Sequence, residues 1–327
     1  MQDISHAQTP LVAVVVTHNR LAQLKTTLAR LRAEPAHVLG AIVVVNNASS
    51  DTTQDWLNTA EDPRLHALHL PENRGGAGGF EAGMRYAANA FAPDWIVVMD
   101  DDARPAAGAL ARFGSQDRSK AEAWAAAVFH PDGRLCDMNR PFQNPLWHKA
   151  LLRKALTKGR EGFYLAAQDY ANTAALQPID GASFVGLFVS RTARQRIGYP
   201  QGALFIYGDD VLYTLTLRQA GGTLLFDPAL RFEHDFESQT AARGRFSPLW
   251  KSYYHHRNLV FIYRLTLGWL FWPALPALAA KWALKTRHYK GERLRYLGLT
   301  ARALWHGLWR KTAVAHQTVQ SWAASPR

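Results

Sequence analysis

Three consecutive acidic residues stand where the sequence suggests the end of a buried strand. Asp100, Asp101 and Asp102 follow the mostly apolar run 95–99 directly. Because side chains alternate in an extended segment, Asp100 and Asp102 are expected to project to one side and Asp101 elsewhere. Carboxylate oxygens are good ligands for Mg²⁺ or Mn²⁺, and such an ion would neutralise a diphosphate leaving group. The alternative is a solvated acidic turn before a helix that begins near Pro105.

A second acidic pair, Asp209 and Asp210, stands just ahead of a predicted helix. An inverting sugar transfer needs a carboxylate that takes the proton from the acceptor hydroxyl. Mutual repulsion tends to raise one pKa of such a pair, while a helix N-terminus stabilises the ionised base. Asp209 could also be a plain helix N-cap. His234 follows a predicted strand, and its imidazole is acceptable to Mn²⁺ beside two carboxylates.

A glycine-rich stretch, NRGGAGGF at 73–80, precedes a helix predicted from Phe80 to about Ala90. Its glycines would let the backbone approach a phosphate closely. The stretch does not fit the dinucleotide-binding pattern, because Glu81 stands where the third glycine belongs, and it lacks the P-loop lysine. A tight turn without a ligand is the alternative.

The elements that must position these groups alternate along the chain. Short β-branched runs at 11–16 and 41–45 flank a segment with leucines at helical spacing, which predicts strand, helix, strand. Continuous apolar strands of this kind are typical of a parallel sheet covered on both faces. The pattern continues to the strand at 95–99, and a strand at 223–228 resumes it, so a doubly wound α/β domain is expected.

The charge of the chain is concentrated at its C-terminal end. Of the net charge of +12, residues 241–327 carry +14, from 15 Lys/Arg against the single acid Glu292, so the rest of the chain carries −2. Seven of the 11 tryptophans lie in the same segment. Basic residues interleaved with Trp suit an anionic bilayer surface. Nucleic acid is the rival ligand for this charge, but the prediction is a membrane surface and no nucleic acid.

The C-terminal segment also shows amphipathic patterning. The apolar run 265–280 is short of the roughly 20 residues that span a bilayer, and Pro273 and Pro276 are expected to break it. Further on, Leu294, Leu297, Leu304, Trp305 and Leu308 share one helical face. The segment is therefore expected to lie in the membrane interface, and docking of its apolar residues on the rest of the protein is the alternative.

The single cysteine, Cys136, excludes an internal disulfide, and the N-terminal residues lack the pattern of a secretory signal. These features predict a reducing compartment and a cytoplasmic protein. The expected organisation is an N-terminal tail at 1–10, a catalytic domain at 11–240 and a helical membrane-associating region at 241–327.

Seven motifs together resemble one family. The ordered set VVVTHNR, VVVNNASSD, NRGGAGGF, VVMDDDARP, FIYGDD, FEHDF and YYHHRN, from about residue 11 to 264, is similar to the bacterial galactofuranosyltransferases of glycosyltransferase family two. The resemblance implies an inverting enzyme with a GT-A fold, a Rossmann-like and mostly parallel sheet, a divalent metal and a nucleotide-sugar donor. UDP-galactofuranose is the favoured donor. The implied acceptor is a glycan or glycolipid, and the implied location is the cytoplasmic face of the bacterial plasma membrane.

The resemblance also implies roles for individual residues. Asp100 and Asp102 would hold the metal and the diphosphate with His234 as a further ligand, Asp210 would be the catalytic base, and Asp209 would contact the acceptor. The implied nucleotide-binding set is Thr17, Asn19, Arg20, Asn46, Asn47, Gly75, Gly76, Asp100 and Asp101. His255 falls where a histidine lies near the donor phosphates or the acceptor.

Two departures from the family pattern bear on specificity. Many members have Asp where this chain has Asn46. Some galactan polymerases have paired tryptophans at the acceptor site after an Asn-Gly, whereas here Asp180-Gly181 is followed by Ala182, Ser183 and Phe184. Rhamnosyltransferases that use dTDP-rhamnose share much of the framework and remain an alternative. A phosphohydrolase with Asp100 as nucleophile and Asp102 as acid is a second alternative. A non-catalytic adaptor that binds through the basic tail is a third, and it leaves both acidic pairs unexplained.

Overall fold

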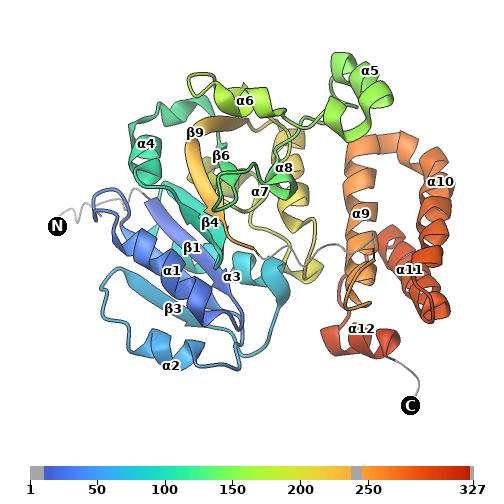
Figure 1. Cartoon of the computed structure of the whole chain (residues 1–327), viewed down its shortest axis with the longest axis horizontal. Coiled ribbons are helices and arrows are strands. Elements are labelled where there is room, and N and C mark those ends of the chain that lie inside the picture. Colours follow the sequence, from blue (N-terminus) through green and yellow to red (C-terminus); the bar gives the residue numbers. More distant parts are fainter. Residues whose placement is uncertain (1–10, 237–244, 325–327) are drawn as a thin grey trace, which may run out of the picture.

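The computed structural model describes residues 11–236 and 245–324. The predicted N-terminal tail, 1–10, lies outside the described residues. An α/β domain forms one side of the molecule, and the C-terminal helices stand beside it (Figure 1).

The first half of the α/β domain is the predicted strand and helix alternation. Strands β1, β2, β3 and β4 pair in parallel in the order β3-β2-β1-β4, with Val16 opposite Asp100 at the carboxyl ends. The β-branched residues of β1 and β2 are fully buried because helices cover both faces of the sheet. The elements are β1 (Leu11–Thr17), α1 (Leu21–Arg32), β2 (Ala41–Asn46), α2 (Thr53–Asn58), β3 (Leu65–His69), α3 (Gly75–Phe91) and β4 (Trp95–Asp100).

Helix α3 begins five residues earlier than the sequence predicted, at Gly75 and not Phe80. Its glycines let the helix approach the sheet closely. A Cβ atom at Gly79 would lie 2.5 Å from Val16 Cγ1, and one at Gly83 would lie 2.5 Å from Val14 Cγ1. The glycine-rich stretch is therefore the first turns of a helix packed on β1, and only its start at Gly75, with φ of +67°, needs a left-handed backbone.

The second half of the sheet is mixed. Strand β8 runs antiparallel between β4 and β6, and β9 pairs with β6 in parallel and with the short strands β5 and β7 in antiparallel fashion. A strand, β5, therefore follows the triple Asp where a helix near Pro105 was the alternative. The elements are β5 (Ala103–Pro105), α4 (Ala109–Ser115), β6 (Ala123–Phe129), α5 (Lys149–Lys158), α6 (Ala167–Ala171), β7 (Gln177–Pro178), β8 (Leu187–Ser190), α7 (Arg191–Ile197), α8 (Asp209–Gln219) and β9 (Leu224–His234).

The C-terminal helices form a bundle of their own that also contacts the α/β domain. A reversal at Gly268, where φ is +55°, folds α9 and α10 into a hairpin (Figure 1). Helix α10 runs through both Pro273 and Pro276, so the prediction that they break the helix was wrong. Pro273 lies in the first turn, where its missing N–H has no intrahelical partner to lose. The helices are α9 (Lys251–Leu267), α10 (Phe271–Leu284), α11 (Arg293–Leu308) and α12 (His316–Ala323).

Candidate active site

The triple Asp lies at the carboxyl end of β4, next to the loop that follows β1. The Thr17 hydroxyl donates to Asp101 Oδ2 at 2.7 Å, and Arg20 Nη1 donates to Asp101 Oδ1 at 3.2 Å and to Asp102 Oδ2 at 2.5 Å. Asp101 and Asp102 thus both contact the first loop, although the alternation of side chains predicted that they point to different sides. This loop places a cation against the carboxylates while leaving the Arg20 side chain 44% exposed.

Asp100, Asp102 and His234 come together although His234 is far from them in sequence. Each offers a ligand atom, and these atoms all lie within 4.8 Å of one another. Strand β9 carries His234 to this position by pairing with β5, where Ala103 is opposite His234. The structure therefore groups the three residues that the sequence analysis assigned to a metal.

The hydrogen bonds around His234 favour a cation in this group. His234 Nδ1 lies 2.8 Å from Asn139 Oδ1, an oxygen that also accepts from the Cys136 thiol, while Asn139 Nδ2 donates to Ser183 Oγ. Nδ1 therefore donates to Asn139, and in the neutral ring Nε2 presents a lone pair. Nε2 lies 3.2 Å from Asp102 Oδ1, and that buried oxygen has no hydrogen-bond donor within the described residues. In the neutral ring two acceptors face one another, and either a proton on Nε2 or a divalent cation between the two atoms would satisfy both.

The three consecutive aspartates differ in the direction of their pKa shifts. Burial raises the pKa of Asp100 well above its usual value, and the nearby carboxylates of Asp102, Asp101, Asp209 and Asp210 raise it further. Burial also raises the pKa of Asp101, to about 6. At Asp102 burial raises the pKa, but a proton on His234 Nε2 and the Arg20 guanidinium outweigh burial and bring the pKa below its usual value. Asp100 thus lacks a compensating cation, which a bound metal ion would supply.

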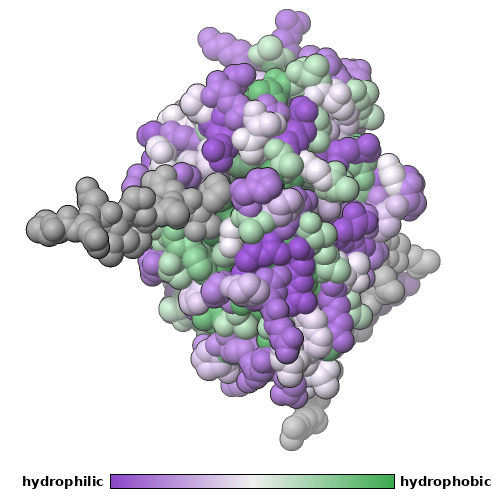
Figure 2. All heavy atoms as spheres, turned by 90° about the vertical axis from the view of Figure 1, so that its left-hand side faces the viewer, coloured by the Kyte–Doolittle hydropathy of each residue, from purple (hydrophilic) through white to green (hydrophobic). Residues whose placement is uncertain are grey.

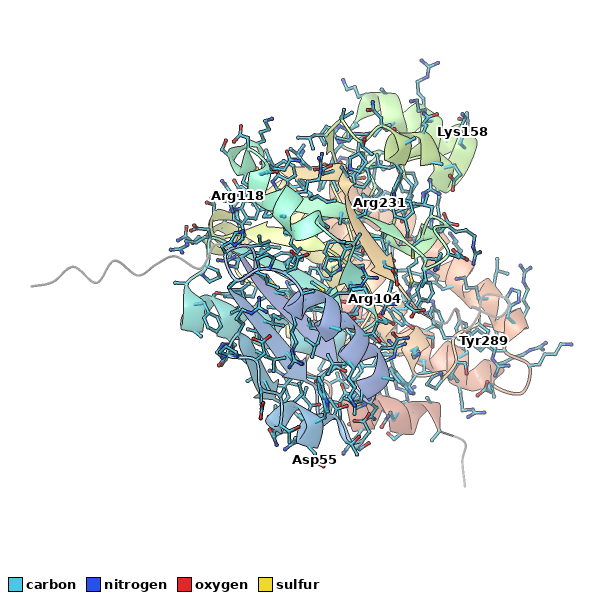
Figure 3. All side chains as sticks on the ribbon, turned by 60° about the vertical axis from the view of Figure 1, so that its left-hand side comes forward. Asp55, Arg104, Arg118, Lys158, Arg231 and Tyr289 are labelled. Carbon is cyan, nitrogen blue, oxygen red and sulfur yellow. The ribbon has the colours of Figure 1, made fainter. Side chains whose placement is uncertain are left out.

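A buried arginine fixes the strand that carries His234 through two ion pairs. Arg104 Nη2 donates to Glu233 Oε1 at 2.6 Å and to Asp235 Oδ2 at 2.9 Å, so the residues on both sides of His234 are held. Arg104 lies in the middle of the molecule, close to β9 (Figure 3). The sequence analysis missed Arg104, because its partners are about 130 residues away.

The second acidic pair lies in the first turn of α8. Gly208, with φ of +77°, is the N-cap, so Asp209 is a helical residue and not the cap. Burial raises the pKa of Asp209, and the charge of Asp210 makes a smaller contribution in the same direction. Burial also raises the pKa of Asp210, but the backbone amides of Val211 and Phe184 oppose the rise. Asp210 is therefore the member that ionises first, and Asp209 is the member that keeps a proton.

Residues of the YYHHRN motif hold the loop that leads into this pair. Asn258 Nδ2 donates to the carbonyl oxygens of Leu204, Ile206 and Tyr207 at 3.1, 2.9 and 2.8 Å, and Asn258 is buried. The backbone of Tyr207 is left-handed, with φ of +68°. Such a backbone persists where its surroundings hold it. Helix α9 thus positions the acidic pair, a role that the sequence analysis did not assign to it.

A cavity of 560 Å³ opens beside the triple Asp. Of the predicted nucleotide-binding residues, it is lined by Thr17, Arg20, Asn47, Gly75, Gly76, Asp100 and Asp101. At Gly76 no atom lies within 4 Å of the position a Cβ would take. Asn47 also shapes the wall, since its Nδ2 donates to the Gly75 carbonyl at 2.9 Å.

Three other predicted residues lie elsewhere. Asn19 accepts from the Ser50 amide at 2.7 Å, and Asn46 accepts from the Ser49 amide at 3.0 Å, so both shape the loop behind the cavity and neither lines it. His255 packs against Phe246, with ring centroids 4.8 Å apart. Burial and Lys285 lower its pKa to about 4, so His255 is neutral at physiological pH.

The C-terminal helices complete the cavity, which the sequence analysis missed. Its wall includes Trp250 and Lys251 from the start of α9 and His316 and Gln320 from α12. The His316 ring stacks on Phe205, with centroids 4.2 Å apart. Part of the basic tail therefore faces the cavity rather than solvent, so the region 241–327 is not solely a surface element.

Parallel strands β1 to β4 that end at a group of carboxylates are typical of the GT-A fold. Residues 12–123 match the family model described as "Glycosyl transferase family 2". Residues 12–123 are therefore similar to the catalytic domain of that family.

Curated proteins similar to this chain include galactofuranosyltransferases. Galactofuranosyltransferase GlfT1 of Mycolicibacterium smegmatis is 30% identical over 202 residues, which is 61% of this chain and 62% of that protein. An undecaprenyl-phosphate mannosyltransferase of Micrococcus luteus is 38% identical over 94 residues, 28% of this chain and 37% of that protein. The chain thus spans less than two thirds of the length of these relatives.

Solved structures show the fold. A mannosyltransferase from Pyrobaculum calidifontis in complex with GDP-Man and Mn²⁺ has a TM-score of 0.51 at 16% identity, covering 93% of this chain and 88% of that one. S. aureus TarS 1-349 in complex with UDP has a TM-score of 0.51 at 12% identity, covering 96% of this chain and 78% of that one. These similarities confirm the predicted GT-A fold.

Proposed function

We propose that this protein is a metal-dependent inverting glycosyltransferase that moves galactofuranose from UDP-galactofuranose to a hydroxyl of a cell-surface glycan acceptor. One observation carries the proposal. Asp209 and Asp210 lie close enough to Asp100 for their charges to raise the pKa of Asp100, and Asp100 belongs to the group with Asp102 and His234. A proton acceptor and a site for the donor diphosphate are therefore adjacent, as a single displacement requires.

The residues divide the work of this displacement. Asp210, the more readily ionised member of its pair, accepts the proton of the attacking acceptor hydroxyl. Asp209, which keeps its proton, donates a hydrogen bond to the acceptor. Thr17, Arg20 and the start of α3 line the cavity that binds the nucleotide and its phosphates. A Mn²⁺ or Mg²⁺ ion held by Asp100, Asp102 and His234 would neutralise charge on the departing diphosphate.

The phosphohydrolase alternative conflicts with the electrostatics of the site. It needs Asp102 as a general acid, which must hold a proton near neutral pH. His234 and Arg20 instead keep the pKa of Asp102 below its usual value. It also needs Asp100 as an ionised nucleophile, whereas the pKa of Asp100 is raised.

The choice of donor rests on the relatives and on the motif set. The match to galactofuranosyltransferase GlfT1 extends over 61% of this chain, and the match to the mannosyltransferase over 28%.

We expect release of UDP from UDP-galactofuranose in the presence of Mn²⁺ and a galactoside acceptor, and none with EDTA. Turnover of dTDP-rhamnose instead would change the donor but keep the mechanism. Phosphate release from simple phosphomonoesters, without turnover of either donor, would contradict the proposal.

The proposal includes peripheral attachment to the inner face of the plasma membrane. Eight of the 13 large apolar side chains that are exposed among the described residues lie in the C-terminal helices. Two members of the predicted apolar face are exposed: Leu294 is 85% exposed and Trp305 is 59% exposed, so they do not dock on the α/β domain. Two other members, Leu304 and Leu308, pack against α9 and α10. By contrast, apolar residues are scattered over a largely hydrophilic face of the α/β domain (Figure 2).

Helix α5 adds to this surface. It buries no residue, exposes Leu152 and Leu156 among four lysines and arginines, and projects at the same end of the molecule as the turn between α9 and α10 (Figure 1). Lys158 lies at its outer end (Figure 3). A basic amphipathic helix of this kind suits an anionic lipid surface. By length and composition alone, the helical run Lys251–His288 could also cross a membrane, but the reversal at Gly268 favours the interface.

Flotation with vesicles tests this attachment. The protein is expected to float with phosphatidylglycerol vesicles at physiological salt, and Leu156→Glu with Trp305→Glu is expected to reduce the floating fraction several-fold, because both changes put charge on the apolar surface. Asp55→Asn, on the exposed side of α2, is the matched control. A double variant that floats as well as the wild type would exclude this surface.

A further inference from the structure

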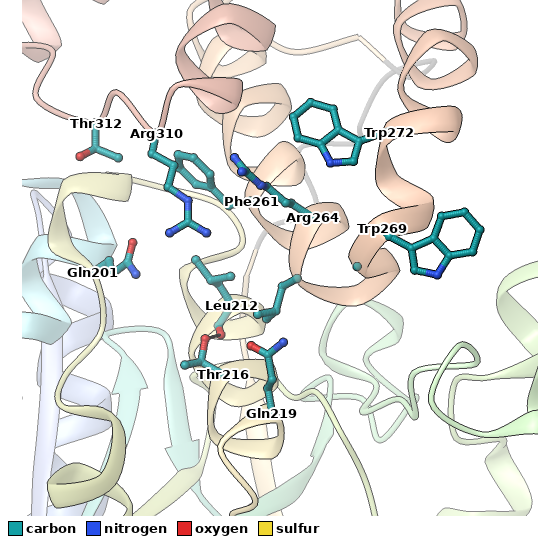
Figure 4. Close-up of a pocket in the computed structure, with 12 residues that line it drawn as sticks. Gln201, Leu212, Thr216, Gln219, Phe261, Arg264, Trp269, Trp272, Arg310 and Thr312 are labelled. Carbon is teal, nitrogen blue, oxygen red and sulfur yellow. Dashed lines mark hydrogen bonds between the residues drawn. The ribbon is translucent and has the colours of Figure 1, made fainter.

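A second cavity, of 590 Å³, lies between α8 and the C-terminal half of α9, away from the residues that line the first (Figure 4). Helix α8 forms one wall, and the segment after α11 closes it from the other side. The lining residues are Gln201, Leu212, Thr216, Gln219, Phe261, Arg264, Leu265, Gly268, Trp269, Trp272, Arg310 and Thr312.

One part of this cavity is apolar and continues to the exposed surface. Phe261 and Leu265 line it from α9, and two indoles stand at its rim (Figure 4). Trp269 is 76% exposed and Trp272 55% exposed. Indole rings at this level of exposure are typical of the boundary between lipid and water. The cavity therefore opens at the end of the molecule that is proposed to face the membrane.

The other part of the cavity is positively charged. Arg264 and Arg310 both line it, and none of the described lining residues is acidic. Arg264 Nη1 donates to the Leu308 carbonyl at 3.2 Å, and the Arg264 guanidinium lies over Trp272, 5.4 Å from the ring centroid. Most of the N–H donors of Arg264 are therefore left for a ligand. Within the described part of the chain Arg310 forms no ion pair. Two guanidinium groups that line a cavity with no acidic residue among its described lining residues favour binding of an anion. The planar arrangement of their N–H donors suits phosphate oxygens.

We propose that this cavity binds the phosphate headgroup of an anionic membrane lipid, with the apolar chain of the lipid lying along Trp269 and Trp272. The proposal rests on the membrane attachment described above and adds a defined lipid site to it. A free phosphate would use the two arginines but would leave the apolar wall and the indole rim without a role. A phosphorylated lipid uses both parts at once.

The position of the cavity links lipid binding to the catalytic helix. Leu212 and Thr216 line the cavity from the same helix whose first turn carries Asp209 and Asp210. At about 1.5 Å per residue, Thr216 is only about 9 Å along the helix from Asp210. A lipid bound here therefore sits next to the helix that positions the acidic pair.

A short-chain lipid that stays monomeric tests the site without a membrane. Dihexanoyl phosphatidic acid, titrated calorimetrically into the full chain, is expected to bind at least about tenfold more tightly than dihexanoyl phosphatidylcholine or inorganic phosphate, because only phosphatidic acid offers both a phosphate monoester and an apolar chain. The variant Arg264→Gln with Arg310→Gln is expected to lose this binding by at least about tenfold. Arg310→Gln alone, which breaks no hydrogen bond of the described structure, should show part of the loss.

Arg287→Gln with Arg293→Gln, two exposed cations outside the cavity, is the matched control and should bind phosphatidic acid like the wild type. Equal weakening in this control would mean general charge attraction, and would overturn the proposal. Equal affinity for inorganic phosphate, or no phosphatidic acid binding by the wild type, would also overturn it. UDP binding in the presence of Mn²⁺ should be unchanged in every variant, which separates this test from the proposed sugar transfer.

Discussion

Asp210→Asn is expected to reduce sugar transfer by on the order of 10³-fold, because an amide cannot take the proton of the acceptor hydroxyl. Donor binding should be unchanged, since Asp210 does not line the donor cavity. Turnover and Mn²⁺-dependent UDP affinity, measured on the same preparation, check both parts. The wild-type rate should also fall as the pH is lowered through the raised pKa of Asp210, because protonation removes the base.

The exposed Asp55, in the first turn of α2, provides a matched control for the same chemical change (Figure 3). Asp55→Asn should turn over at the wild-type rate. An Asp210→Asn variant with unimpaired turnover would remove the base assignment, and Asp209 would then be the residue to replace next.

Asp102→Asn is expected to weaken Mn²⁺-dependent UDP binding by at least about tenfold, because it removes a proposed ligand of the metal ion. His234→Ala should have a similar effect. In EDTA the wild type and both variants should bind UDP equally weakly, since the contribution of the metal is then absent from all three. Calorimetric titration of UDP with and without Mn²⁺ measures these affinities.

Thermal melting of both variants separates loss of the metal site from loss of the fold, because Asp102 also accepts from Arg20. A variant that melts like the wild type but has lost metal-dependent binding supports the assignment. Full Mn²⁺-dependent binding by a folded Asp102→Asn protein would show that the metal, if any, is held elsewhere.

Much of the α/β domain and both acidic groups were predictable, because the physical causes are local. The β-branched runs of β1 and β2 indicate buried parallel strands, and the carboxyl ends of such strands meet at one edge of a sheet. Asp100 at the end of β4 therefore had to lie near the loop that contains Thr17. His234 was a candidate ligand from its residue type and its place after a predicted strand, and the family resemblance then implied its role beside Asp100 and Asp102, because a single histidine carries no such pattern.

The parts that were missed depend on contacts distant in sequence. Strand β6 is AWAAAVF, which has few β-branched residues and forms a strand because its neighbours β8 and β9 pair with it. The start of α3 was misplaced because glycines disfavour a helix, and only packing on Val14 and Val16 explains them. The contacts of Asn258 with the loop before Asp209 could not be read from the basic, aromatic composition of the tail.

The anomeric configuration of the product tests the central claim most directly. Proton NMR of the disaccharide made from UDP-galactofuranose and a simple galactoside in the presence of Mn²⁺ compares the transferred sugar with the donor. A single displacement with Asp210 as the base predicts the opposite configuration in the product. A product that retains the configuration of the donor would contradict the account.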